Sequence, residues 1–173
     1  MVNHKIQNIE LRPISSNDAY VLMELNNCNE ISNYVVGNPK IVSLEQQLEW
    51  MEKLKNETNT VRWMIIFNGK AVGTIIVSSI DRINLVGNMN IKLLPEYQGQ
   101  GIAKKAMLKA CNLAFDELKL FCLTANILPY NAASCELFKS IGFHQDGILR
   151  SRVVKNGNRF DLLTFSYLKT ERT

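Results

Sequence analysis

The run from Leu93 to Ala103 constrains the fold of this chain more than any other feature. A strand-like segment, Asn90 to Leu93, enters the run, and an amphipathic helical pattern follows it, so Gly99 and Gly101 lie where a strand turns into a helix. The first turn of a helix leaves backbone N–H groups unpaired and places the positive end of the helix dipole beside them. The sequence therefore predicts an anion site at this turn, and phosphate is the anion that such sites commonly bind.

The composition is that of an ordinary globular protein. The 173 residues are 46% hydrophobic and 21% charged, which favours a single domain over residues 1–173 with a sizeable core. The net charge of +4 suits an anionic ligand, but it is not gathered into the basic stripe that nucleic-acid binding needs. We therefore expect no nucleic-acid partner.

Targeting and metal-binding patterns are missing from the sequence. The start of the chain has no signal-peptide pattern, and no apolar run is long enough to cross a membrane. The four cysteines form no CxxC pair, and neither histidine has a cysteine at metal-ligand spacing. We expect a cytoplasmic protein with reduced thiols, no metal site and no membrane partner.

Periodicity along the chain predicts the element order β-α-α-β-β-β-α-β-α-β-β. The expected strands are 9–13, 62–67, 71–80, 86–93, 120–127, 143 onward and 160–168, and the expected helices are 16–26, 43–56, 100–118 and 131–141. Asn68-Gly69 and Asn156-Gly157 predict tight hairpin turns. Ser43 to Gln46 matches a capping box, and Asn131 and Gly142 are the expected caps of the last helix.

Two motifs resemble the signatures of the GNAT N-acetyltransferases. Gln98 to Ala103 matches Q/R-x-x-G-x-G/A, and Asn131 to Phe143 resembles N-x-x-[AS]-x-x-[LV]-[YF]-x-x-x-GF. One predicted helix and one buried strand separate them, and the element order is that of the GNAT fold over 9–168. The resemblance implies an α/β (α+β) fold: a mixed, mostly antiparallel sheet of about seven strands with helices on both faces.

Short sequences outside the two signatures narrow the resemblance to one group within the family. Leu11-Arg12-Pro13 near the start, and Asn156-Gly157 followed by Asp161, are typical of that group. It includes ribosomal-protein N-terminal, spermidine and amino-sugar acetyltransferases.

The resemblance implies acetyl-CoA as the cofactor. Backbone N–H groups from Gly99 to Ala103 would hold its diphosphate, and glycine at 99 and 101 removes Cβ atoms that would block the approach. The strand before the turn would pair with the pantetheine amides, as an added strand does. The expected cofactor-binding residues are Ile91, Lys92, Leu93, Gln98, Gly99, Gln100, Gly101, Ile102, Ala103, Asn126, Asn131, Ser134, Phe138 and Lys139.

A general acid is needed to protonate the thiolate that leaves in acetyl transfer. Many relatives use a tyrosine of the second signature, but that position is Phe138 here, which cannot donate a proton. Ser134 lies one turn earlier on the same helix face, and the equivalent serine is the proposed acid in the ribosomal-protein group. Ser134 is therefore the candidate acid, and a purely structural role at the helix start stays open.

No side chain stands out as the base that removes a proton from the acceptor amine. Relatives often carry a glutamate on the fourth strand, and that position is Asn88 here, which cannot accept a proton near neutral pH. Four alternatives stay open: water held by backbone carbonyls, Glu30, Asp161, or an amine that arrives neutral.

The acceptor site in this fold lies between the loop of the first two helices and the last hairpin, here 26–39 and 150–159. Glu30 is the only acid in the first wall. The second wall is basic and contains Arg150, Arg152, Lys155 and Arg159. We expect Tyr34, Arg150 and Arg152 to contact the substrate. The positive charge of the second wall suits a neutral or anionic acceptor better than a polycation.

The function implied is acetyl-CoA-dependent transfer to a primary amine of a small molecule, such as an amino sugar or an amino acid, by direct attack in a ternary complex. The alternatives are a protein N-terminal acetyltransferase, a polyamine acetyltransferase and a non-catalytic acyl-CoA-binding module. Relatives often dimerise, so a homodimer is a further expectation.

Overall fold

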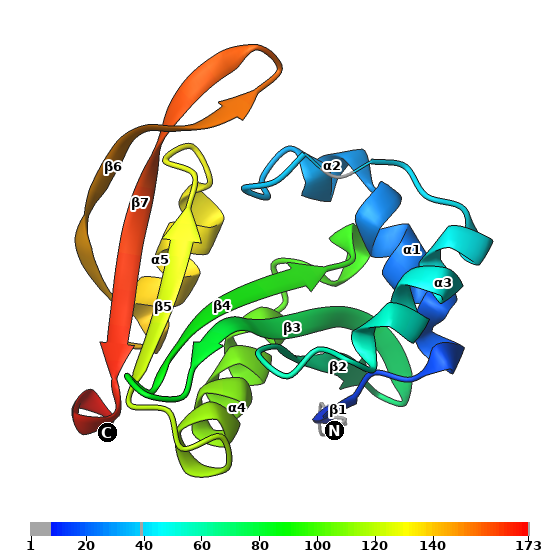
Figure 1. The fold of residues 1–173 in the computed structure, drawn as a ribbon, viewed down its shortest axis with the longest axis horizontal. Helices are drawn as coiled ribbons and strands as arrows, with labels where there is room; N and C mark the ends of the chain where they lie inside the picture. The colour runs from blue at the N-terminus through cyan, green and yellow to red at the C-terminus, as the bar shows by residue number, and fades with distance from the viewer. Residues whose placement is uncertain (1–7, 39, 173) are drawn as a thin grey trace, which may run out of the picture.

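The computed structural model describes residues 8–38 and 40–172. A seven-stranded sheet with the order β1-β2-β3-β4-β5-β7-β6 forms its centre (Figure 1). Neighbouring strands run antiparallel except β4 and β5, which are parallel. The predicted mixed and mostly antiparallel sheet is confirmed. The strands are β1 (Ile9–Pro13), β2 (Val61–Phe67), β3 (Lys70–Asp81), β4 (Val86–Leu93), β5 (Cys122–Ile127), β6 (His144–Lys155) and β7 (Asn158–Leu168).

The helices differ from the prediction mainly by one short element between β1 and β2. They are α1 (Ala19–Asn27), α2 (Asn29–Ser32), α3 (Leu44–Leu54), α4 (Ile102–Asp116) and α5 (Ala132–Ile141), with single 3-10 turns η1 (Ser16–Asp18), η2 (Pro95–Tyr97) and η3 (Lys169–Glu171). The sequence did not predict α2, because Ile31 is its one buried residue and four residues show no repeat. Within the described ranges, no helix is both long and apolar enough to span a membrane.

Helices cover both faces of the sheet, as predicted. The alternation of β2 shows the division, because Trp63 and Ile65 join the core under α4 and α5, whereas Met64 packs with α1 and α3. Small side chains on α4, including the fully buried Ala106 and Ala110, let this helix lie close against the sheet. Figure 1 shows α4 on one side of the sheet and α1 and α3 on the other.

The predicted turns and caps are confirmed. Asn68-Gly69 and Asn156-Gly157 both have positive φ at each residue, as a type I′ hairpin turn requires. Ser43 accepts a hydrogen bond from the Gln46 backbone N–H at 3.2 Å, and the Gln46 side chain accepts one from the Ser43 N–H at 2.9 Å. These contacts lie within a few residues of chain, which explains why the sequence revealed them.

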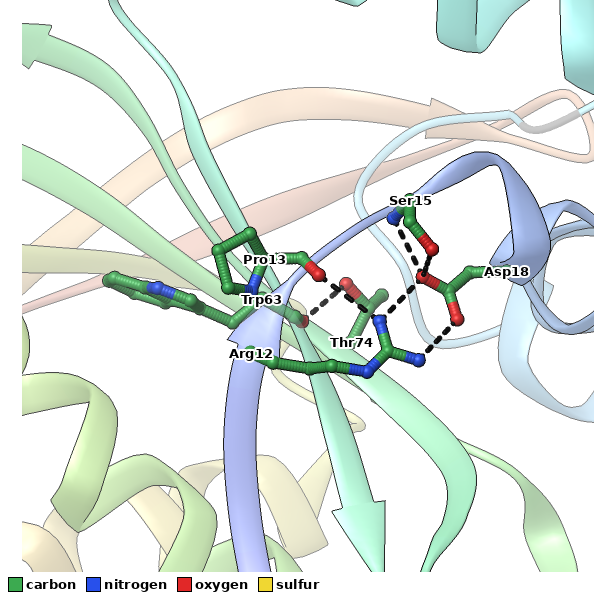
Figure 2. Close-up of polar contacts among 6 residues, drawn as sticks. All are labelled: Arg12, Pro13, Ser15, Asp18, Trp63 and Thr74. Atoms are coloured by element: carbon green, nitrogen blue, oxygen red, sulfur yellow. Dashed lines mark hydrogen bonds and ion pairs between the residues drawn. The ribbon is translucent and has the colours of Figure 1, made fainter.

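An ion pair between a half-exposed arginine and a buried carboxylate fixes the segment that leads from β1 into α1 (Figure 2). Arg12 donates two hydrogen bonds to the Asp18 carboxylate, at 2.7 and 2.8 Å, and the Ser15 backbone N–H donates a third at 2.7 Å. Asp18 is 3% exposed and stands directly before α1. Burial acts to raise the pKa of Asp18, but the hydrogen bonds from Arg12 and Ser15 outweigh it and hold that pKa below its usual range.

Candidate functional site

The two parallel strands at the centre of the sheet separate before they end. β4 and β5 pair only over Val86–Asn88 and Cys122–Thr124, although β4 continues to Leu93 and β5 to Ile127. Figure 1 shows the two strands diverging from their paired start. From Met89 onward, the edge of β4 that faces β5 therefore has no partner strand, and a V-shaped gap opens in the sheet.

Alternate backbone groups of β4 face this open edge. The Lys92 carbonyl oxygen lies against Gly73 of β3, and the Leu94 N–H donates to the Val72 carbonyl at 2.9 Å. Because the peptide groups of successive residues in a strand point to opposite edges, those of Ile91 and Leu93 face the gap. The unpaired edge is thus the kind of edge to which an extended amide chain adds by hydrogen bonding.

The structure specifies the contacts of two predicted cofactor residues, Lys92 on β4 and Gln98 in the turn after it. The backbone of Lys92 faces β3, so Lys92 does not offer its peptide group at the open edge and could contact a ligand only through its side chain. The Leu93 carbonyl already accepts a hydrogen bond from Gln98 Nε2 at 2.9 Å. Gln98 therefore acts by holding the turn onto the end of β4. The Lys92 side chain is half-buried, and burial lowers the pKa of its ammonium group.

The glycine turn after β4 opens onto solvent. Gly99 and Gly101 have φ of +70° and +75°, and Gly101 is the N-cap of α4 without a side-chain cap. α4 begins at Ile102 rather than at the predicted Gln100, because Gly101 adopts the left-handed conformation. Within the described chain, the backbone N–H groups from Gly99 to Ala103 have no hydrogen-bond acceptor. An added Cβ at either glycine meets no atom within 4 Å, so a side chain at either position would extend into open space.

The remaining predicted cofactor residues lie on the opposite arm of the gap, formed by β5 and α5. Asn126 is half-buried near the end of β5, and Lys139 is exposed on α5. Phe138 is different, because its ring is 2% exposed and packs edge-to-face on Phe143 with the centroids 4.9 Å apart. Phe138 is a core residue here and has almost no surface to offer a ligand.

The start of α5 holds the candidate acid. Asn131 Oδ1 accepts a hydrogen bond from the Ser134 backbone N–H at 3.1 Å, which confirms Asn131 as the helix cap. The Asn131 Nδ2 group also donates to the Tyr34 carbonyl at 3.4 Å. Ser134 is half-buried, and its hydroxyl has no partner among the described residues. That hydroxyl is thus free to bond a ligand.

Asn88 lies where β4 and β5 part. Its Nδ2 group donates to Thr124 Oγ1 at 3.1 Å, and its Oδ1 atom accepts from Asn90 Nδ2 at 3.1 Å. Asn88 and Thr124 form the last paired row of the two strands. The position that carries a glutamate in relatives is therefore part of an uncharged hydrogen-bond chain at the vertex of the gap, and it has no group that removes a proton.

The two candidate bases with a carboxylate, Asp161 and Glu30, differ in their hydrogen bonding and exposure. Asp161 Oδ1 accepts from the Ser151 backbone N–H at 2.8 Å, where β6 bulges between Leu149 and Val153. Ser151 has φ of +50°, so Asp161 stabilises this bulge. Glu30 is exposed in the first turn of α2 and forms no ion pair in the described structure. Glu30 is the freer of the two.

The two predicted acceptor walls are in direct contact, because Lys155 of the hairpin wall bonds to the backbone of the other wall. Tyr34 is 50% exposed, with its ring centroid 6.0 Å from that of Tyr130, and Arg150 and Arg152 are exposed on β6. Lys155, by contrast, is 6% exposed, and its ammonium group donates to three backbone carbonyls of residues 32–37. It is not available to an anionic acceptor. From the sequence alone, Lys155 is expected in the basic acceptor wall, and no local pattern indicated its burial.

Comparison with known sequences gives a family. A family model described as an acetyltransferase (GNAT) domain matches residues 8–144. The chain is 26% identical over 164 residues to the uncharacterized N-acetyltransferase YoaA of Bacillus subtilis, and the match covers 92% of each chain. It is 23% identical over 170 residues to the spermidine N(1)-acetyltransferase of Escherichia coli K12, covering 95% of this chain and 91% of the relative.

Comparison with solved structures gives the same fold. The crystal structure of spermidine N-acetyltransferase from Vibrio cholerae, in complex with CoA and spermine, superposes with a TM-score of 0.89 at 22% identity. The superposition covers 94% of this chain and 96% of that one. At this identity, the likeness shows that the two proteins share a fold.

Proposed function

The chain belongs to the GNAT acetyltransferase family, and on that premise we propose that it transfers the acetyl group of acetyl-CoA to a primary amine of a small molecule. The observation that carries the proposal is the open edge of β4, followed by a glycine turn. The N–H groups of this turn, Gly99 to Ala103, have no hydrogen-bond acceptor among the described residues. An extended amide chain followed by a diphosphate has the two chemistries that this edge and this turn bind.

The residues present fit acetyl-CoA. The diphosphate would accept hydrogen bonds from the turn before α4, where the open space at Gly99 and Gly101 leaves room for it. The pantetheine amides would pair with the peptide groups of Ile91 and Leu93. The exposed ammonium group of Lys139, on the other arm of the gap, is a candidate partner for the phosphates of the nucleotide.

Acetyl-CoA, when bound, supplies a thioester carbonyl that an amine attacks and a thiolate that leaves. The chain's part is to orient the amine, to accept its proton and to protonate the leaving sulfur. The free Ser134 hydroxyl is the proposed acid. Because Asn88 cannot take a proton, we propose that the proton of the amine passes to water, with Glu30 as the alternative carboxylate.

A polyamine is the second candidate acceptor within the same reaction. The specific observation in its favour is the match to spermidine acetyltransferases over 95% of the chain. The burial of Lys155 also removes one positive charge from the hairpin wall, which weakens the electrostatic objection to a cationic acceptor.

A thiol-release assay tests the function. Each reaction contains the protein, acetyl-CoA and one candidate acceptor. The acceptors are spermidine, an amino-sugar phosphate, an amino acid and a peptide with a free N-terminus. We expect turnover with at least one small amine and slower turnover with the peptide. CoA binding without turnover on any acceptor would indicate a non-catalytic module, and turnover on the peptide alone would indicate an N-terminal acetyltransferase.

Replacing Ser134 by alanine is expected to lower kcat about 100-fold, the lower end of the range for a positioned general acid. The helix cap survives, because Asn131 bonds the backbone N–H of residue 134 and not its side chain. Steady-state kinetics give kcat, and calorimetry gives the Kd of acetyl-CoA, which we expect to stay near the wild-type value.

Ser140→Ala is the matched control for this variant. Ser140 lies on the same helix and its hydroxyl donates to the Leu137 carbonyl at 2.8 Å, away from the start of α5. We expect wild-type kinetics from it. Unchanged kcat in Ser134→Ala would remove Ser134 from the acid role.

A further inference from the structure

Lys155 forms an unusual contact between two distant parts of the chain. It is the last residue of β6, is 6% exposed, and donates to the carbonyl oxygens of Ser32 at 2.6 Å, Val35 at 2.7 Å and Gly37 at 3.2 Å. These bonds use the three donors that an ammonium group has. Burial lowers the pKa of Lys155, and the three carbonyls provide the hydrogen bonds that a buried charge requires.

Other contacts hold the same loop, residues 33–38, which we call the bridging loop. Tyr130 donates from its hydroxyl to the Asn33 carbonyl at 3.0 Å, and Asn38 donates from Nδ2 to the Val154 carbonyl at 3.1 Å. Val36 packs against the buried cluster of Leu128, Val153 and Leu162. The bridging loop is therefore tied by polar and apolar contacts to the segment after β5 and to the β6–β7 hairpin.

The bridging loop spans the two sides of the gap. Its near end packs on the β4 side, where Val35 contacts the cluster of Leu25, Ile31 and Leu94. Its far contacts are with the β5, β6 and β7 side. Figure 1 shows α2 and the loop after it lying near the diverging ends of β4 and β5. At this end of the sheet, the loop connects the β4 side to the β5 side, although β4 and β5 do not pair beyond Asn88.

The loop is also linked to the candidate acid. Asn131 donates to the Tyr34 carbonyl and, with its other amide atom, accepts from the backbone N–H of Ser134. A shift of the bridging loop would thus disturb the start of α5 as well as Tyr34. The position of the loop therefore bears on both the predicted acceptor wall and the chemistry beside it.

We propose that Lys155 is a positioning residue for the acceptor amine: it clamps the bridging loop to the β6–β7 hairpin and so sets the shape of the acceptor side of the gap. This inference rests on the proposed function. Without the ammonium group, the carbonyl oxygens of Ser32, Val35 and Gly37 lose the donor that they share, and acceptors left unpaired in the folded chain are costly. The loop would then leave the hairpin to solvate them, whereas the open edge of β4 and the turn before α4 would stay in place.

Lys155→Met tests the proposal, because methionine retains an unbranched apolar side chain without the charge. We expect the KM of the acceptor to rise about 10-fold to 100-fold, the scale of loss from misplacing a bound reactant. The Kd of CoA, measured by calorimetry, should stay within about twofold, since no hydrogen bond joins residues 33–38 to residues 98–103 in the described structure. Amide hydrogen exchange over 32–38 should become faster.

Three further variants sharpen the test. Lys169→Met also removes a lysine-to-carbonyl bond, from Lys169 to Phe115 at 3.3 Å, and should leave acceptor KM unchanged. Lys155→Arg keeps the charge and should recover part of the loss. Asn38→Ala removes a single exposed contact of the same loop, so it should fold even if Lys155→Met does not, and it should raise acceptor KM by a smaller factor.

Several results would overturn the proposal. One is an equal rise in acceptor KM and CoA Kd, which would mean general loss of structure. Another is faster exchange of the loop with acceptor KM unchanged in both Lys155→Met and Asn38→Ala. If the wild-type chain turned over no amine, the proposed function and the positioning role would both fall, and the exchange data would separately report whether the clamp exists.

Discussion

Gly101→Val is expected to abolish measurable acetyl-CoA binding while the chain stays folded. A side chain at residue 101 points into open space, where no protein atom lies within 4 Å, and that space is where the diphosphate is proposed to bind. Loss of two hydrogen bonds to a charged group, at about 1.5–3 kcal/mol each, weakens binding by at least about 100-fold. Calorimetric titration with CoA measures the change.

The control for this variant must carry the same backbone strain away from the site. Gly69→Val meets this need, because Gly69 has φ of +81°, also has no neighbour within 4 Å of an added Cβ, and lies in the β2–β3 turn. A non-glycine residue in the left-handed region costs about 1–2 kcal/mol, so both variants should lose a similar amount of stability. Wild-type CoA affinity in Gly101→Val would show that the diphosphate binds elsewhere.

Asp18→Ala is expected to lower the free energy of unfolding by about 2–3 kcal/mol, below the usual loss for a broken buried pair because Arg12 can then be solvated. The carboxylate is 3% exposed and accepts hydrogen bonds from both Arg12 and Ser15, whereas the Arg12 side chain is 43% exposed. Without Asp18, the turn before α1 loses the group that holds it. Urea denaturation measures the difference, with Asp116→Ala as the control.

The control and the pH dependence make this prediction specific. Asp116 pairs with Arg172 at 2.8 Å, but both side chains are at least one-third exposed, so its removal should change the free energy of unfolding much less than Asp18→Ala does. The pKa of Asp18 is lower in the folded chain than in the unfolded one, so its stabilisation is complete above the unfolded pKa and declines as the pH falls through the folded pKa. The gap between wild type and Asp18→Ala should therefore narrow in acid. A gap independent of pH would contradict the ion-pair explanation.

Much of the candidate site could be predicted because its features are local in sequence. The glycines of the turn before α4, the Asn131 cap and both hairpin turns depend on the backbone of a few consecutive residues. The conformation that each turn requires selects glycine or asparagine, so the residue type reports the structure. The unpredicted α2 has only four residues, which are too few to show a helical repeat. The two-residue error at the start of α4 arises because Gly101 adopts the left-handed conformation.

Residue roles that depend on distant neighbours could not be predicted in this way. The sequence alone makes Asp161 a candidate base, but its carboxylate accepts the Ser151 backbone N–H that stabilises the bulge of β6. Phe138 lies in a signature motif, yet its ring belongs to the core. A sequence pattern indicates which side chains lie on one face of a helix or strand. Only the packed fold determines which residues those side chains already bond or pack against.

By itself, the sequence determined the fold class and the glycine turn before α4, because periodicity, caps and turns record local backbone conformation. The tertiary structure alone decided how the acceptor side is built. Lys155 reads as an exposed cation beside an Asn-Gly turn, but its three acceptors lie 118 to 123 residues earlier in the chain. Such a contact leaves no local pattern, because the carbonyl oxygens that bind the ammonium group belong to the backbone and place no demand on residue type.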